Sequence, residues 1–312
     1  MLPPVDLGAA LRALLILPRA EQPHAVRALL ARLPPPAAEE PWNTAFGPDS
    51  LYHAFTRCSV ARGLHGANRA VLRPLFDARP GFRVVEVGGG DGTLWAGLLR
   101  PDDTGEIVVV DPHPDGAAGV RRLAPPGVRV HHLVVPVQDA ALPEADAVVC
   151  SLVLHHVAGA DAAARAAVGL AGTGKAEALA AFRAAIAPRD GRVLLNEADV
   201  YCDLGLAPGD PVLTDRLLDS YVRRFSVSLA HDLATRTDAD AALRARWTAI
   251  VRDWSLAQVG LAGAAAYADR DVYELDVVSW LGLVGRAGLT VVERRFTDRW
   301  LLFHQYVLSA GA

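Results

Sequence analysis

The sequence is poor in the features that mark several large classes of protein. Cysteine occurs three times in 312 residues, as Cys58, Cys150 and Cys202, with no CxxC pair. Neither a disulfide framework nor a cysteine zinc site is therefore expected. A reducing compartment is the simplest environment for such a chain, and we predict a cytoplasmic location.

Long apolar runs and a targeting signal are also missing. The N-terminal stretch has no basic n-region, carries Asp6, and is interrupted by Pro18 and by arginines, unlike a cleavable signal peptide. The longest apolar stretches, Ala147–Ala160 and Leu256–Ala268, are too short and too interrupted to cross a bilayer, which needs about 20 apolar residues. We expect no membrane partner.

Positive charge does not dominate. The chain has 31 Lys and Arg against 35 Asp and Glu, a net charge of −4, and Lys175 is its single lysine. This balance supplies no field that would attract nucleic acid, so a nucleic-acid partner is not expected. Aromatic residues are few, at 6%, whereas hydrophobic residues reach 52%, a globular composition built on Ala, Leu and Val.

The first 80 residues have helical periodicity. Leucines recur on one helical face between Leu7 and Leu15, and apolar residues repeat this spacing from Val26 to Leu33. Two further helices are expected over Asp49–Gly63 and Ala67–Phe76, with Gly66 between them.

From Phe82 the pattern changes to short β-branched runs that alternate with helical stretches, which is typical of a parallel sheet covered on both faces. The strands are expected at Arg83–Val87, Glu106–Val110, Val128–Leu133, Ala147–Cys150 and Arg192–Asn196. Helices are expected at Thr93–Arg100, Asp115–Leu123 and Asp161–Ala187, and later at Asp276–Gly288. The last two apolar runs, Thr290–Phe296 and Leu301–Leu308, are close enough in sequence to form an antiparallel hairpin.

The most informative segment is Val84–Leu94, with the sequence VVEVGGGDGTL. A buried strand leads into glycines that allow positive φ angles and a close ligand, and a helix N-terminus would offer free N–H groups. A dinucleotide fingerprint needs a third glycine where Thr93 stands. Glu86 would repel a pyrophosphate but attract the ammonium and sulfonium groups of S-adenosylmethionine. Both residues disfavour a nicotinamide oxidoreductase.

This segment resembles the first motif of the class I S-adenosylmethionine-dependent methyltransferases, an acidic residue followed by G-x-G-x-G. Asp111 ends the second strand, Val137–Pro143 resembles the family segment that holds the adenine, and Ala145–His156 resembles the fourth strand with its L-H-H turn. Gln138 departs from the usual glycine. The resemblance extends over residues 80–200 and 276–310 and implies a Rossmann-like seven-stranded α/β sheet of order 3-2-1-4-5-7-6, with strand 7 antiparallel.

The resemblance also implies the cofactor and the residues that bind it. The cofactor is S-adenosylmethionine, with the ribose at Asp111 and the adenine amino group at Asp139. The full set of expected cofactor contacts is Glu86, Gly88, Gly90, Gly92, Asp111, Pro112, Asp139, Ala140 and Ser151.

The acceptor side rests on weaker patterns. His155, His156 and Glu197 follow the fourth and fifth strands and are candidate catalytic residues, because an imidazole or a buried carboxylate can take up a proton. A structural turn, which is common in the resembled family, is the alternative for the two histidines, and a satisfied polar lining is the alternative for Glu197. Tyr201, Tyr221 and His231 are candidate acceptor contacts, and no metal site is expected because adjacent histidines on a strand face opposite ways.

These patterns divide the chain into an N-terminal helical segment or lid (1–80), a cofactor-binding core (81–199), a helical insertion that forms an acceptor lid (200–275), and a C-terminal helix and hairpin that complete the core (276–312). We predict in-line methyl transfer to a small organic acceptor of specialised metabolism. Methylation of a peptide or protein, and a non-catalytic binding protein with the same fold, remain alternatives. The oligomeric state stays open, with a homodimer among the options.

Overall fold

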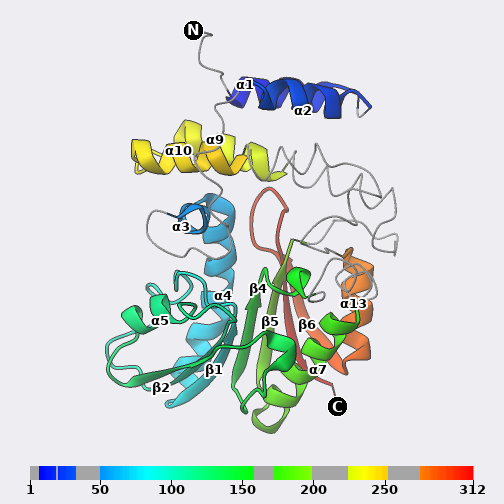
Figure 1. Ribbon diagram of the computed structural model, residues 1–312. Helices are drawn as coiled ribbons and strands as arrows, with labels where there is room; N and C mark the ends of the chain where they lie inside the picture. The colour runs from blue at the N-terminus through cyan, green and yellow to red at the C-terminus, as the bar shows by residue number, and fades with distance from the viewer. Residues whose placement is uncertain are drawn as a thin grey trace.

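The computed structural model describes residues 7–18, 20–32, 50–157, 172–198, 224–251 and 275–311. Its centre is a seven-stranded sheet of order β3-β2-β1-β4-β5-β7-β6 (Figure 1). The strands are β1 (Phe82–Val87), β2 (Gly105–Val110), β3 (Val128–Leu133), β4 (Ala147–Ser151), β5 (Arg192–Glu197), β6 (Leu289–Phe296) and β7 (His304–Ala310).

The pairing confirms the expected topology. β1 pairs in parallel with β2 and β4, β2 with β3, and β4 with β5. β7 runs antiparallel to both β5 and β6, so the predicted C-terminal hairpin is present. Its turn is closed by Asp298, whose carboxylate accepts hydrogen bonds from the backbone N–H groups of Trp300, Leu302 and Phe303.

The helices lie on the two faces of the sheet and above its carboxyl edge. The α-helices are α1 (Leu7–Ile16), α2 (Gln22–Leu30), α3 (Leu51–Thr56), α4 (Ser59–Ala78), α5 (Ala118–Leu123), α7 (Thr173–Ile186), α9 (Val227–Thr235), α10 (Ala241–Ile250) and α13 (Val277–Arg286). The described residues also form the 3-10 turns η1 (Val137–Asp139), η2 (Leu154–His156) and η3 (Ala187–Arg189).

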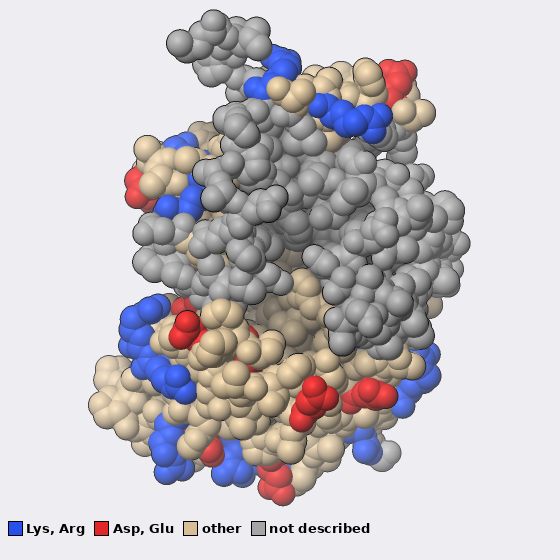
Figure 2. All heavy atoms as spheres, in the orientation of Figure 1, with Lys and Arg blue, Asp and Glu red and all other residues tan. Residues whose placement is uncertain are grey.

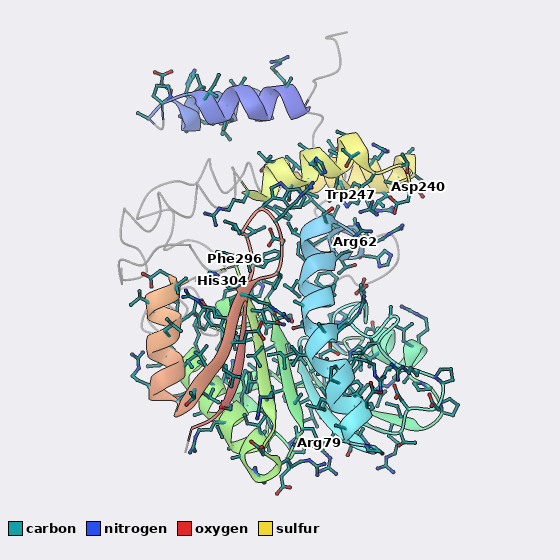
Figure 3. The ribbon with its side chains drawn as sticks, turned by 180° about the vertical axis from the view of Figure 1, so that it is seen from behind. Arg62, Arg79, Asp240, Trp247, Phe296 and His304 are labelled. Carbon is teal, nitrogen blue, oxygen red and sulfur yellow. The ribbon has the colours of Figure 1, made fainter. Side chains whose placement is uncertain are left out.

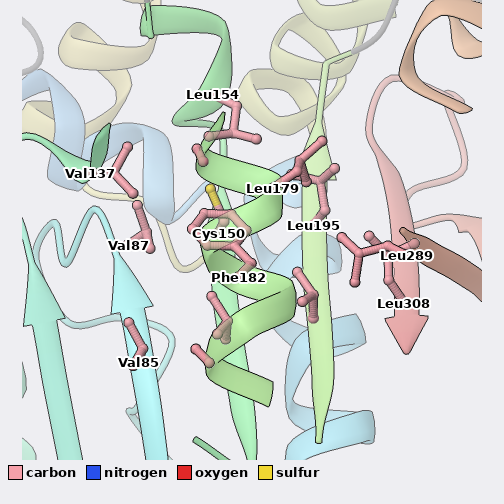
Figure 4. Close-up of a cluster of buried hydrophobic side chains, with 14 of the residues drawn as sticks. Val85, Val87, Val137, Cys150, Leu154, Leu179, Phe182, Leu195, Leu289 and Leu308 are labelled. Carbon is pink, nitrogen blue, oxygen red and sulfur yellow. The ribbon is translucent and has the colours of Figure 1, made fainter. Parts of the chain in front are cut away.

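Successive side chains of the buried strands point to opposite faces of the sheet and belong to two separate hydrophobic cores. Val85 and Val87 belong to the cluster that α7 and α13 cover, with Phe182 at its centre (Figure 4). Val84 points the other way, into the cluster that α4 and α5 cover together with Trp95. Both faces of the parallel part are therefore buried, as the continuous β-branched runs predicted.

A third core lies beyond the carboxyl edge, among helices α1, α2, α3, α9 and α10. Trp247 on α10 is fully buried there, and its Nε1–H donates to the backbone carbonyl of Ala54 on α3 at 2.8 Å (Figure 3). Leu302 and Phe303, from the turn between β6 and β7, join the same cluster. The hairpin thus connects the sheet to the helices above it.

One sequence expectation about the first βα unit is wrong. Thr93–Arg100 was expected to be a helix, but it forms a series of turns. Gly97 has φ +73°, a left-handed conformation that an α-helix does not tolerate. The segment still buries Trp95 and Leu98 against the sheet.

The break between the two helices that precede β1 is also displaced. It was expected at Gly66, but the chain turns at Arg57 and Cys58, and α4 continues through Gly66 and Pro74 to Ala78. The buried apolar face of α4 compensates for its internal residues that disfavour a helix, Gly63 and Gly66 at roughly 1 kcal/mol each and Pro74 at roughly 3 kcal/mol. Among the described residues, no helix combines the length and apolarity needed to cross a membrane.

Candidate active site

The glycine loop follows β1 at the carboxyl edge of the sheet. Gly88, Gly90 and Gly92 all have positive φ angles, between +53° and +80°. A Cβ on Gly92 would lie 2.5 Å from the backbone carbon of Gly119 on α5, so the loop packs directly on the next helix. The predicted turn is present, and it lies where ligands bind in open α/β sheets.

Glu86 lies beneath this loop, near the end of β1. It is 5% exposed, and its Oε2 accepts a hydrogen bond from Trp95 Nε1 at 2.6 Å. Burial raises the pKa of Glu86 to about 8; the Trp95 hydrogen bond works against this rise, and the charges of Asp111 and Asp91 add to it. A cationic ligand beside this buried carboxyl group would favour its ionised form and would be attracted to it.

Asp111 directly follows β2 and lies beside the loop. Its two carboxylate oxygens accept from the backbone N–H groups of Gly89 at 3.1 Å and His113 at 2.8 Å. A carboxylate has about four lone-pair sites, so Asp111 can still accept hydrogen bonds from the two hydroxyl groups of a diol. Of the other expected contacts on this side, Pro112 and Asp139 are exposed and Ala140 is half-buried beside η1.

Helix α3 docks onto the glycine loop through Asp91. One oxygen of the Asp91 carboxylate accepts from His53 Nδ1 and Thr56 Oγ1, both at 2.8 Å, and the other accepts from the Thr93 N–H at 2.9 Å. Burial works to raise the pKa of Asp91, but these hydrogen bonds outweigh it and the pKa is lowered. This contact could not be predicted from the sequence, because nothing in the local pattern pairs α3 with the loop.

Tyr52 on α3 also covers the loop. A Cβ on Gly90 would lie 2.4 Å from the Tyr52 hydroxyl, so the phenol lies against the central glycine. Burial and then the charges of Asp91, Glu86 and Asp111 raise the pKa of Tyr52 far above its usual value. The phenol therefore keeps its proton and can donate.

Ser151, another expected cofactor contact, ends β4 within a buried polar network. Its Oγ accepts from Asn68 Nδ2 and Asn196 Nδ2, both at 3.0 Å. Arg295 Nε donates to Gln305 Oε1 at 2.9 Å, and Gln305 Nε2 donates to Asn68 Oδ1 at 2.7 Å. Since arginine can only donate, it fixes the direction of the chain of hydrogen bonds. Ser151 receives two N–H bonds and has its own proton left to donate.

His155 and Glu197, predicted separately from the ends of the fourth and fifth strands, lie together. His155 Nδ1 lies 2.7 Å from Glu197 Oε2, and the Leu154 N–H donates to Glu197 Oε1 at 3.0 Å. Glu197 is 1% exposed and His155 8% exposed. The exposed His156 lies with its ring centroid 4.3 Å from that of His155. The turn between them and β4 contains Leu152 at φ +57°, a strained angle for a bulky residue and more frequent at functional sites.

The expected acceptor contacts are only partly described. Tyr201 and Tyr221 lie outside the described residues. His231 lies on α9, half-buried, with its ring centroid 5.6 Å from that of Trp300. That contact connects α9 to the turn between β6 and β7 rather than to the glycine loop.

Within the described residues, no group of three His, Cys, Asp or Glu side chains could hold a metal ion. Figure 2 shows basic and acidic side chains interspersed over the sheet-containing part of one face.

Comparison with known proteins gives a family match and weak structural likenesses. Residues 85–189 match the model of a methyltransferase domain family. No curated protein matches the sequence. Similar solved structures include the pyocyanin biosynthetic protein PhzM, at 17% identity and TM-score 0.43 over 84% of this chain and 62% of that chain. This chain therefore spans less than two thirds of that protein's length.

Two further structures are similar. An O-methyltransferase family 2 protein from Planctomyces limnophilus, in complex with apigenin, is 18% identical with TM-score 0.42 over 93% of this chain and 68% of that chain. The Burkholderia thailandensis 1,6-didemethyltoxoflavin-N1-methyltransferase, with bound 1,6-didemethyltoxoflavin and S-adenosylhomocysteine, is 16% identical with TM-score 0.46 over 84% of each chain.

The methyltransferase model and the order of the strands point to the same kind of domain. The match covers the chain from β1 through the glycine loop to η3, and the strand order is β3-β2-β1-β4-β5-β7-β6 with β7 antiparallel. Residues 85–189 are therefore similar to methyltransferase domains, and they lie on a Rossmann-like seven-stranded sheet.

Proposed function

We propose that this enzyme transfers the methyl group of S-adenosylmethionine to an O–H or N–H group of a small organic acceptor, with His155 as the general base. The observation that carries the proposal is the hydrogen bond of 2.7 Å between His155 Nδ1 and the buried Glu197 carboxylate. Both groups lie at the carboxyl ends of β4 and β5, the edge at which the glycine loop lies.

The hydrogen bonds of Glu197 support one tautomer of the imidazole. A carboxylate can only accept, so its partner Nδ1 must carry a proton. In a neutral imidazole, Nε2 is then the basic atom. Glu197 would also stabilise the imidazolium that forms when Nε2 takes the acceptor's proton. Because Glu197 is held in addition by the Leu154 N–H, the pair is fixed before an acceptor binds.

The remaining roles follow from the chemistry of the cofactor. We assign the ribose hydroxyls to Asp111, the adenine amino group to Asp139, and the sulfonium and ammonium charges to the field of Glu86. Methyl transfer discharges the sulfonium, so a closed site of low dielectric favours it, together with alignment of the two reacting atoms.

We extend the proposal to the organisation of the chain. Residues 1–80 and 200–275 are assigned to closing the site and selecting the acceptor, while residues 81–199 and 276–312 bind the cofactor. The buried contact between α3 and α10 through Trp247 supports such a shared helical cover. A cytoplasmic location belongs to the same proposal, on the low cysteine content, and so does a role in specialised metabolism.

The test is a methyl-transfer assay with S-adenosylmethionine carrying a ¹³C-methyl group. A panel of phenols, carboxylic acids, amines and a pool of peptides is incubated with enzyme, and mass spectrometry follows labelled products and S-adenosylhomocysteine. We expect label in a small molecule and none in the peptides. Labelled peptides would favour the protein-methylating alternative, and binding without any product would favour a non-catalytic protein.

The base is tested on the acceptor that this panel identifies. His155→Ala is expected to lower kcat about 10²- to 10⁴-fold and to leave S-adenosylhomocysteine affinity unchanged. Glu197→Gln should lower kcat as well, since an amide no longer fixes the tautomer. His131→Gln, on β3 with an exposed side chain, is the matched control. An undiminished rate in His155→Ala would contradict the assignment.

A further inference from the structure

His65 lies at the edge of the sheet where the cofactor binds, although no sequence pattern singled it out. Helix α4 runs antiparallel to β1: Arg79, at its C-terminal end, donates to Asp146 just before β4, and Arg62 lies at the opposite end (Figure 3). The N-terminal half of α4 therefore reaches past the carboxyl ends of the strands.

Two neighbours on α4 fix the position of His65 more closely. Asn68, three residues on, donates to Ser151 at the end of β4, and Arg69, four residues on, donates to the carbonyls of Thr93 and Leu94 behind the glycine loop. Residues three and four apart share a helix face. His65 lies one turn, about 5 Å, further along the axis, over the space between the loop and the β4 turn.

The imidazole of His65 has a polar atom without a partner. Its Nδ1 is buried and makes no hydrogen bond within the described part of the chain. Burial lowers the pKa of His65 to about 4; the Asp91 charge opposes this shift, and the Arg69 charge adds to it. The ring is therefore neutral near pH 7 and can carry its proton on Nδ1. Leaving a buried polar atom without a partner is unfavourable, so a ligand that accepts its hydrogen bond would stabilise the site.

Tyr52 approaches the same space from α3. Its hydroxyl lies against Gly90, and the charges of Asp91, Glu86 and Asp111 help to raise its pKa. The charge of Asp91 acts on both Tyr52 and His65, so the two uncharged side chains lie near the same carboxylate.

The cofactor explains why donors are needed among carboxyl groups. S-adenosylmethionine carries two cationic groups, the sulfonium and the ammonium, which the three carboxyl groups attract. It also carries one carboxylate, which they repel at close range. That carboxylate needs hydrogen-bond donors between itself and the acidic side chains. Tyr52 and His65 supply an O–H and an N–H without adding charge.

We propose that Tyr52 and His65 bind the carboxylate of the methionine part of the cofactor, so that α3 and α4 form one wall of the cofactor site. This inference rests on the cofactor assignment and adds residues that the motif resemblance does not include. It also gives the N-terminal helices a part in cofactor binding as well as in closing over the acceptor.

The experiment compares two ligands that differ only in the proposed contact. Calorimetry measures the Kd of S-adenosylhomocysteine and of decarboxylated S-adenosylhomocysteine, which keeps the amine and lacks the carboxylate. For Tyr52→Phe and His65→Ala we expect affinity for the first ligand to fall about 10- to 100-fold each, the effect of one hydrogen bond to a charged group. Affinity for the second ligand should stay within about twofold, and His65→Gln should recover part of the loss.

Gly66→Ala is the matched control on α4. A Cβ there meets nothing within 4 Å, so both affinities should equal those of the wild type, and thermal melting confirms that every variant is folded. Equal losses for the two ligands, or no loss for either, would overturn the inference. Wild-type enzyme that binds neither ligand would overturn the cofactor assignment itself and the inference with it.

Discussion

Glu86 is expected to make cofactor binding depend on pH. Its pKa is raised to about 8, so near pH 7 only about one molecule in eleven carries the ionised form that attracts a sulfonium. At pH 9 the ionised share is about ten in eleven. If the cofactor binds the ionised form, its affinity should rise about tenfold between pH 7 and pH 9.

The raised pKa of Glu86 also makes the stability of the folded protein depend on pH. In the unfolded chain Glu86 ionises near its ordinary pKa of 4.5, whereas the folded protein holds the proton up to about pH 8. The native state therefore binds more protons in this window, and stability falls as pH rises from 4.5 to 8. Glu86→Gln removes this loss.

The assay is calorimetric titration with S-adenosylmethionine at half-unit steps from pH 6.5 to 9.5, for wild type and Glu86→Gln. The amino group of the ligand titrates in the same range, near pH 8, but it affects both proteins equally. The ratio of the two affinities therefore isolates Glu86. A ratio that stays constant across this range would refute the reasoning, because it would mean that the carboxyl group does not change its charge with binding.

Three further predictions concern neighbouring contacts. Trp95→Phe removes the indole donor from the Glu86 carboxyl group, and the midpoint of the pH-dependent affinity should move up by about 1–2 units; an unmoved midpoint would exclude that hydrogen bond as a control on the pKa. Asp232, 1% exposed on α9, accepts from the Ser59 backbone N–H at 2.7 Å and from the Ser59 hydroxyl. Asp232→Ala should lower the free energy of unfolding by about 1–3 kcal/mol in urea titrations, and a loss below about 0.5 kcal/mol would show that α9 does not anchor α4. Gly90→Ala places a methyl group 2.4 Å from the Tyr52 hydroxyl at a residue with φ +53°, so S-adenosylhomocysteine affinity should fall at least about tenfold; wild-type affinity would contradict the loop geometry.

The strands of the sheet could be predicted from the sequence because each one is marked by a short pattern of neighbouring residues. Each strand is a short β-branched run bounded by turn residues, and all five parallel strands lie within one residue of their expected limits. The hairpin followed from two apolar runs with few residues between them. The order of the strands came from the resemblance, since periodicity alone does not say which strands pair.

The parts that sequence reasoning missed depend on contacts between distant segments. Gly97 ends a helical pattern only because its φ is positive, which the apolar spacing does not reveal. The Asp91 contacts join residues 35 and 38 positions apart, and His65 becomes notable only once α4 lies across the loop. His155 and Glu197 were predicted one by one, and the fold brings them to within 2.7 Å.

The central claim is that the glycine loop binds S-adenosylmethionine rather than a dinucleotide. The most direct measurement is paired calorimetric titration of the wild-type enzyme with S-adenosylmethionine and with NAD. The structure and the motifs predict saturable, one-to-one binding of S-adenosylmethionine and no heat of binding with NAD. Micromolar binding of NAD, with none of S-adenosylmethionine, would contradict it.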